Sequence, residues 1–255
     1  MRQGLYPVLF SDPIDRWAKD AVAAWDFLEN RARWNGGRIG ALANTPGWTH
    51  TGTTHSAGGV LYAVNQAASL VTFPSGVLRR TDKGVLIEGA RTNLCLQSQT
   101  FDNASWTKSF TTVTADAAVA PDGTTTADKL VEDSSAGQQH RLNQTITVSN
   151  ATAYTFSVYV KAAERLNIDM RISTATNVAS ASFNLQAGTA LTPASGASSI
   201  AALGNGWYRC SITGTSDSTT AIVRINLGDT ASNSGPATYN GDGTSGLYLW
   251  GAQLE

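Results

Sequence analysis

Aromatic residues alternate with polar residues along the second half of the chain, a combination suited to binding sugars. The apolar face of a sugar ring packs on Trp or Tyr, and the hydroxyls at its edge bond to Asn, Asp, Gln or Arg. On alternating stretches, Tyr159 falls on the side of Lys161, and Trp207 falls on the side of Arg209. The predicted glycan-binding residues are therefore Tyr159, Lys161, Trp207, Arg209 and Tyr239, with Lys161 or Arg171 favouring an acidic polysaccharide.

Burial in a core is the competing interpretation of these aromatics, because large aromatic side chains usually fill protein interiors. The core interpretation is favoured for Trp207 and Trp250. For Tyr159 and Tyr239 the two interpretations remain open. The remaining aromatic candidates are Trp106 and Tyr248.

The residues that enzymes use for acid–base or nucleophilic chemistry are scattered. His50, His55 and His140 have no metal-ligand spacing and are expected to be solvated loop residues. The chain has no nucleophile elbow and no phosphate-binding loop. The adjacent acids Glu132 and Asp133 would point to opposite faces of a strand, so they cannot flank one glycosidic bond together. We expect no enzymatic activity.

Neither a cofactor nor a metal is expected. The small acids Asp102, Asp122 and Asp242 could hold a structural calcium through oxygen ligands, but their spacing singles out no site. Cys95 and Cys210 each sit in an apolar run and are expected to be free and buried, although spacing alone does not exclude a disulfide between them.

The composition narrows the class of protein. The 255 residues carry a net charge of -1, which argues against a nucleic-acid binder. Only 15% of residues are charged, and 23 Ser and 31 Thr take their place, as is typical of extracellular β-proteins. No apolar run reaches the length of a membrane span, and the amino terminus lacks the regions of a signal peptide.

The amino-terminal region contains the one helical period. Apolar residues recur at spacings of three and four from Ile14 through Trp17 to Trp25, which predicts a helix over residues 13–24. Residues 25–34 could instead be extended. A helix this short, with an apolar face, needs a second surface, so Ile14, Trp17 and Trp25 are predicted to serve attachment or oligomerisation.

From about residue 108 the period changes to two, as in strands with one buried face. Turn residues separate the alternating stretches. The pattern predicts a mainly β chain: an antiparallel two-sheet β-sandwich of the jelly-roll type over residues 91–255, preceded by a helix and loop attachment region over residues 1–90. Its nine predicted strands are 108–118, 126–132, 139–149, 153–161, 165–173, 178–185, 206–214, 220–228 and 246–254.

Several motifs occur in an order that is specific to one group of proteins. They begin with Gly84-Val85-Leu86-Ile87-Glu88-Gly89-Ala90-Arg91-Thr92-Asn93-Leu94 and continue with Tyr154-Thr155-Phe156-Ser157-Val158-Tyr159-Val160-Lys161-Ala162, Gly206-Trp207-Tyr208-Arg209 and Leu247-Tyr248-Leu249-Trp250-Gly251-Ala252-Gln253-Leu254-Glu255. Over roughly residues 60–255 the chain resembles the head spike or fibre domains of phage and gene-transfer-agent virions. Within the first motif, Glu88 and Arg91 are expected to pair structurally, with an anionic-sugar ligand as the alternative.

The resemblance implies a jelly roll similar to carbohydrate-binding modules, displayed on a virion to contact host surface polysaccharide. It implies capsid or tail proteins as partners and a virion location after assembly in the cytoplasm of the bacterial host. Because repetition strengthens weak sugar binding, we expect a homo-oligomer, with a trimer favoured. The alternatives are a purely structural capsid-decorating or tail protein and a glycan depolymerase.

Overall fold

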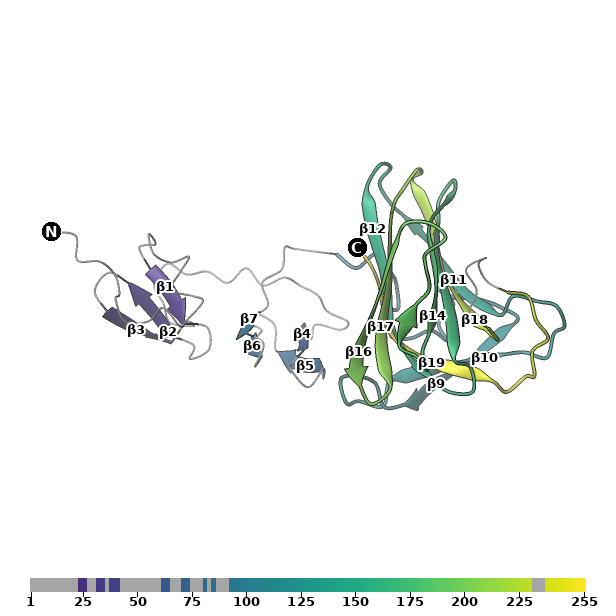
Figure 1. The fold of residues 1–255 in the computed structure, drawn as a ribbon, viewed down its shortest axis with the longest axis horizontal. Helices are drawn as coiled ribbons and strands as arrows, with labels where there is room; N and C mark the ends of the chain where they lie inside the picture. Colours follow the sequence, from purple (N-terminus) through teal and green to yellow (C-terminus); the bar gives the residue numbers. More distant parts are fainter. Residues whose placement is uncertain are drawn as a thin grey trace.

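The computed structural model describes residues 92–230 and 237–255 in full and, ahead of them, the backbone of seven short strands (Figure 1). Strands β1, β2 and β3 form one antiparallel sheet, β4 pairs with β5, and β6 pairs with β7. Their bounds are Ala23–Asp26 (β1), Arg31–Trp34 (β2), Gly37–Ala41 (β3), Leu61–Val64 (β4), Leu70–Phe73 (β5), Arg80–Thr81 (β6) and Gly84–Val85 (β7).

Most of the predicted amino-terminal helix lies outside the described residues. Ile14 and Trp17 of that helix are outside the described residues. His50, His55 and the Glu88–Arg91 pair, which follow later in the chain, are outside them too. Trp25 lies in strand β1, and β2 follows at Arg31–Trp34, so the extended alternative holds for these two short segments. The last two residues of the predicted helix, at positions 23 and 24, also belong to β1, so the prediction is wrong at that end.

Two antiparallel sheets of six strands each make up the sandwich (Figure 1). The β12 sheet has the order β16-β17-β12-β19-β10-β9, and the β13 sheet has the order β15-β14-β13-β18-β11-β8. This is the predicted two-sheet jelly roll. No helix long and apolar enough to span a membrane occurs in the described part of the chain. The bounds are Thr107–Ser109 (β8), Thr111–Ala118 (β9), Ala127–Glu132 (β10), Arg141–Thr147 (β11), Ala153–Ala162 (β12), Asn167–Ser173 (β13), Asn177–Asn184 (β14), Thr189–Ala190 (β15), Ala197–Gly204 (β16), Trp207–Thr215 (β17), Thr220–Gly228 (β18) and Gly246–Leu254 (β19).

The core between the sheets is formed by the alternate apolar residues of each strand. In β12 the buried side chains are Phe156, Val158 and Val160, and in β13 Ile168 and Met170 face them across the sandwich. Each strand therefore has one apolar face that is removed from water, which is the main driving force for closing the two sheets. The other face of each sheet, here called its outer face, carries the polar residues.

A β-bulge in β19 shapes the outer face of the β12 sheet. Gly251 adopts φ +62°, and the pairing with β12 shifts register between Ser157 and Tyr159. A Cβ at Gly251 would lie 3.0 Å from the Tyr159 ring, so both the dihedral angle and the close approach require glycine. The bulge sets the ring of Trp250 against Tyr159, with 5.4 Å between the ring centroids.

Two features of the sandwich differ from the prediction. Residues 108–118 form two strands rather than one, because Phe110 (φ 57°) turns the chain from β8, which pairs with β11, into β9, which pairs with β10 in the other sheet. Strands β15 and β16, which lie at the edges of the two sheets, were not predicted: β15 has only two residues, and the Ala and Ser residues of β16 show little apolar alternation.

The two cysteines are free and buried, as predicted. Cys95 and Cys210 both belong to the core between the sheets, where burial raises the pKa of each thiol well above its usual value. Each therefore packs as a small apolar side chain that remains protonated at neutral pH.

Candidate functional site

Four of the five predicted sugar-binding residues lie together on the outer face of the β12 sheet. Tyr159 is directly opposite Arg209 on the neighbouring strand, and Lys161 is directly opposite Trp207. Trp250 lies opposite Tyr159 on the other side. We call these five residues the aromatic face. The alternation of β12 and β17 therefore predicted the grouping correctly.

The two tryptophans of the aromatic face are covered. Trp207 is 3% exposed and Trp250 2% exposed, in a small apolar cluster that is separate from the core between the sheets. The turn between β9 and β10 accounts for the cover, because the Trp207 Nε1 donates to the Val119 carbonyl (3.1 Å) and the Trp250 Nε1 donates to the Thr126 hydroxyl (3.2 Å). Both residues are buried, as favoured, but on the outer side of the sheet and not in the main core.

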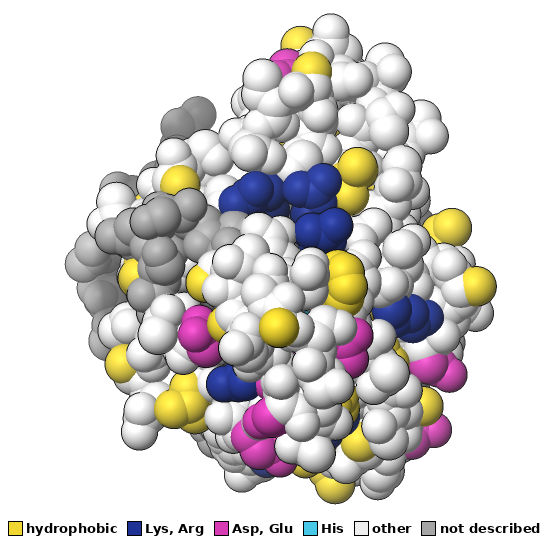
Figure 2. Space-filling model, turned by 90° about the vertical axis from the view of Figure 1, so that its right-hand side faces the viewer, with side chains coloured by type: hydrophobic (Ala, Val, Ile, Leu, Met, Phe, Trp, Pro, Cys, Tyr) yellow, Lys and Arg dark blue, Asp and Glu magenta, His cyan; other side chains and the backbone are white. Residues whose placement is uncertain are grey.

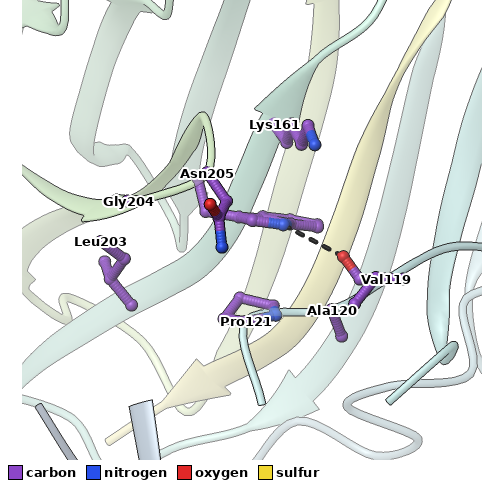
Figure 3. A pocket seen from close by; sticks show the side chains of 8 residues that line it. Val119, Ala120, Pro121, Lys161, Leu203, Gly204 and Asn205 are labelled. Carbon is purple, nitrogen blue, oxygen red and sulfur yellow. Dashed lines mark hydrogen bonds between the residues drawn. The ribbon is translucent and has the colours of Figure 1, made fainter. Parts of the chain in front are cut away.

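A pocket of about 400 Å³ opens beside this cluster (Figure 3). Lys161 lies on one side of it, Ala120 and Pro121 lie on the other, and Asn205 also lines it. Its polar side chains are Lys161 and Asn205, and the Trp207 edge is already bonded to Val119. The pocket is lined by Val119, Ala120, Pro121, Lys161, Leu203, Gly204, Asn205 and Trp207.

Tyr239, the fifth predicted residue, does not join the aromatic face. It forms an isolated bridge with Gln138 and is 8% exposed. Its hydroxyl donates to Glu132 (2.7 Å), and its ring packs against the ring of His140 (4.6 Å between centroids). Arg165 lies over the same ring at 4.9 Å. Tyr239 is therefore held inside a polar network at one end of the sandwich.

Glu132 is the centre of that network. Its carboxylate is buried and accepts two hydrogen bonds from Arg165, one from Tyr239 and one from the Asp242 backbone. Burial alone would raise the pKa of Glu132, but the donors outweigh it and hold the pKa below its usual value. The prediction that His140 is solvated is wrong: it is fully buried, with Nδ1 at 2.7 Å from the Phe110 carbonyl.

The outer face of the β13 sheet carries a second polar surface, which we call the arginine face. Arg171 on β13 lies directly opposite Arg224 on β18 and opposite Ser180 on β14. Next to this row, Asp169 lies between Ser182 and Asn226. Figure 2, which views the molecule from the side where Figure 1 shows β11 and β18, shows basic side chains gathered above the centre. The arginine face comprises Arg141, Asn143, Asn167, Asp169, Arg171, Ser180, Ser182, Arg224 and Asn226.

Unpartnered polar atoms concentrate at the arginine face. Eight buried side-chain nitrogen or oxygen atoms of the described residues have no hydrogen-bond partner, and six of them lie on this face or on Ser195, which bridges to Ser180. Native proteins leave few such atoms unsatisfied, so their clustering needs a cause. The six are Arg141 Nε, Asn167 Oδ1, Arg171 Nε, Ser180 Oγ, Ser195 Oγ and Asn226 Oδ1.

Two buried asparagines of this surface each have an oxygen without a donor in the described residues. Asn226 is 1% exposed, and its amide nitrogen lies 3.4 Å from the Asp169 carbonyl, which leaves its Oδ1 without a donor. Asn167 uses its nitrogen on the Asp229 carbonyl in the same way and also leaves Oδ1 without a donor. The groups that the face offers at its surface are the partly exposed arginines and Asn143, which together supply donors and an acceptor to a sugar hydroxyl.

Of this face, the sequence had singled out Arg171 alone. The signal that could have found the rest is the residue type at alternate positions: Asn167, Asp169 and Arg171 in β13, and Arg224 and Asn226 in β18. Outward positions filled by Asn, Asp and Arg, where Ser or Thr prevail elsewhere, mark a surface with more hydrogen-bonding capacity than solubility requires.

No group of three or more metal-ligating side chains occurs among residues 92–230 and 237–255. Two of the three acids considered for calcium instead close turns. Asp122 accepts from the Thr124 backbone and hydroxyl, and Asp242 accepts from Thr244 and Ser245.

Comparison with known proteins gives weak likenesses. No protein-family model matches the chain, and no curated protein matches it in sequence. The enzymatically active domain of bacteriophage CBA120 tailspike protein 4 is similar over 64% of this chain and 21% of its own, at 13% identity and a TM-score of 0.38. This chain thus spans about a fifth of that tailspike chain.

Two shorter solved structures are similar over nearly their whole length. TmCBM61, solved in complex with β-1,4-galactotriose, is 12% identical with a TM-score of 0.40, over 65% of this chain and 99% of its own. A CBM22-1 xylan-binding domain from Paenibacillus barcinonensis is 14% identical with a TM-score of 0.35, over 66% of this chain and 97% of its own. Likeness at this level carries neither a residue role nor a function across.

Proposed function

We propose that this chain is a phage virion protein, a head spike or fibre subunit, that binds host surface glycan through the arginine face. The observation that carries the proposal is the group of partly exposed Arg and Asn side chains on that face, beside buried polar atoms that have no partner within the described residues. A sugar supplies several hydroxyls at close spacing, and each can donate and accept. Such a ligand would bond to the partly exposed Asn143, Arg171 and Arg224, because Asn167, Asn226 and Ser180 are buried.

The aromatic face is the less suitable site. Its two tryptophans are 3% and 2% exposed under the β9–β10 turn, so they offer little ring surface to a sugar even where Trp207 lines the pocket. Only Tyr159, Lys161 and Arg209 remain partly exposed there. Arg209 also donates to Ser157 (2.9 Å), so part of its hydrogen-bonding capacity is used within the sheet.

The virion role rests on the ordered motifs of the sequence, and it implies assembly in the cytoplasm of the bacterial host and contact with capsid or tail proteins. A single sugar face binds weakly, so attachment to a cell calls for several copies. We therefore propose a homo-oligomer, most simply a trimer, built partly by the segment that contains Ile14, Trp17 and Trp25. Light scattering of the full chain tests this: a monomeric mass at every concentration contradicts it.

A glycan array with the full chain tests the binding function. The parent should bind one group of host glycans, and Asn143→Ala should weaken this binding, while Gln253→Ala on the opposite sheet should not. Matching melting temperatures would show that both variants fold. If the folded parent binds no glycan on the array or on host polysaccharide, the chain is a purely structural virion subunit. Release of reducing ends from that polysaccharide would instead indicate a depolymerase.

A further inference from the structure

Three arginines form a continuous positive surface at the centre of the arginine face. Arg171 and Arg224 are direct cross-strand neighbours. Arg141, on β11, lies diagonally from Arg224, because its direct partner on β18 is Asn226. Like charges directly opposite on neighbouring strands destabilise a sheet. The pKa of Arg224 is lowered by its burial and then by the charges of Arg141 and Arg171, which shows that the three guanidinium groups act on one another.

Among the described residues one acid, Asp169, shares this surface with the three arginines, and its charge interacts with that of Arg171. The ion pairs among the described residues lie elsewhere: Lys129 pairs with Glu164, and Arg165 pairs with Glu132 and Asp242. A fourth contact joins His140 to Asp133. The one carboxylate on the arginine face, Asp169, accepts a hydrogen bond of 2.8 Å from Ser182 and forms no ion pair with Arg171 within 4.0 Å.

The arginine face also lacks a stacking platform. The residues of β11, β13, β14 and β18 that point outward are Arg, Asn, Asp, Ser, Thr, Val, Ile and Gly, and none is aromatic. A neutral sugar usually gains much of its affinity from the packing of its apolar face on Trp or Tyr. On this face, affinity has to come from hydrogen bonds and charge instead.

We propose that the arginine face binds an anionic polysaccharide, with the acidic group of one sugar seated between Arg171 and Arg224. The hydroxyls of the same or the next sugar bond to Asn143, which is partly exposed and lies directly opposite Arg224. The inference rests on the proposed function of this face as the glycan site, and it names the chemical class of the glycan. A planar guanidinium pair suits a carboxylate or sulfate, because each arginine donates two parallel hydrogen bonds.

The test uses a set of acidic capsular polysaccharides, each in its native form and in a form whose uronate carboxyls have been reduced to alcohols. The two forms share linkage and length and differ in charge. The full chain should bind at least one native polymer and lose about tenfold or more in affinity for its reduced form, the loss expected for a charge-assisted hydrogen bond. Binding should also weaken as salt is raised.

Two matched variants locate the charge that matters. Arg224→Gln removes one charge from the centre of the face, and Arg209→Gln makes the same change on the outer face of the other sheet. Arg224→Gln should lose about tenfold or more in affinity for the native polymer, and Arg209→Gln should bind like the parent. Circular dichroism and melting temperature confirm that each variant folds.

The other outcomes overturn the inference in distinguishable ways. Equal binding of native and reduced polymers would leave the face a glycan site but exclude an anionic ligand. Loss of binding in Arg209→Gln, with Arg224→Gln unaffected, would move the site to the aromatic face. If no polymer is bound, native, reduced or neutral, the proposed function fails and the inference fails with it.

Discussion

The hydroxyl of Tyr239 donates a hydrogen bond of 2.7 Å to the carboxylate of Glu132, which is buried within the fold. The same carboxylate accepts from Arg165, which holds it ionised at one end of the sandwich. Tyr239 thus supports the structure at a point where the sequence suggested a sugar ligand.

Tyr239→Phe should therefore destabilise the protein and leave glycan binding intact. Removal of the hydroxyl leaves a buried carboxylate with one donor fewer, which costs about 1–3 kcal/mol. Urea unfolding measures the loss. Tyr248→Phe is the control, because the Tyr248 hydroxyl has no hydrogen bond within the described residues. A stable Tyr239→Phe variant that no longer binds glycan would place Tyr239 in the binding site.

Trp207→Ala should behave as a core substitution. The side chain is 3% exposed and bonded to the Val119 carbonyl, so its truncation leaves a cavity under the β9–β10 turn. We expect a loss of about 3–5 kcal/mol in unfolding free energy, measured with urea. Tyr159→Ala, from the same face but partly exposed, should cost clearly less. If Trp207→Ala kept parental stability and reduced adsorption to host cells, Trp207 would contact the glycan and would not be needed for packing.

Arg224→Gln should raise the melting temperature in low salt. The substitution removes the repulsion between directly opposed arginines, which the single acid of the face, Asp169, offsets only in part. The gain should shrink as salt screens the remaining charges. Differential scanning calorimetry at two ionic strengths measures it. A gain in stability combined with weaker glycan binding is expected of a residue that serves binding at a cost to stability. A drop in melting temperature that does not change with salt would contradict the proposed repulsion between the arginines.

Asp169 should make stability depend on pH. Its burial raises its pKa from 3.8 to about 6, against a hydrogen bond from Ser182 and the charge of Arg171. The folded state therefore holds this proton more tightly than the unfolded state, and stability falls as the pH rises from about 4 to about 6. Asp169→Asn should remove that fall, so the variant should be more stable than the parent at pH 7.5, with the difference closing below pH 4.

The protonation of Asp169 should also change the affinity of the arginine face for an acidic polysaccharide. Arg171 lies on its own strand and Arg224 on β18, while β14 presents only the serines 180 and 182 to it. Above pH 6 the Asp169 charge opposes an anionic ligand. The affinity for an acidic polysaccharide should therefore be higher at pH 5 than at pH 7.5. Calorimetric titration of parent and Asp169→Asn at both values measures this, and a parent affinity that does not change with pH would contradict it.

The sequence by itself determined the two-sheet sandwich and the inward and outward side of most strands. Because one face of each strand is buried, apolar residues recur at every second position, as at Ile168, Met170 and Ile172. This period can be recognised within a single stretch of sequence. It failed at Phe110, where one apparent strand divides between two sheets, and at β16, whose small edge residues carry no apolar period.

Only the tertiary structure decided which outer face is open and which residues share it. Trp207 and Trp250 are covered by a turn that lies far away in the sequence, so their alternation predicts a direction and not an exposure. Arg171 and Arg224 are 53 positions apart and meet because β13 pairs with β18 in one particular register. Register and cover depend on contacts between distant segments, and a local period contains no information about them.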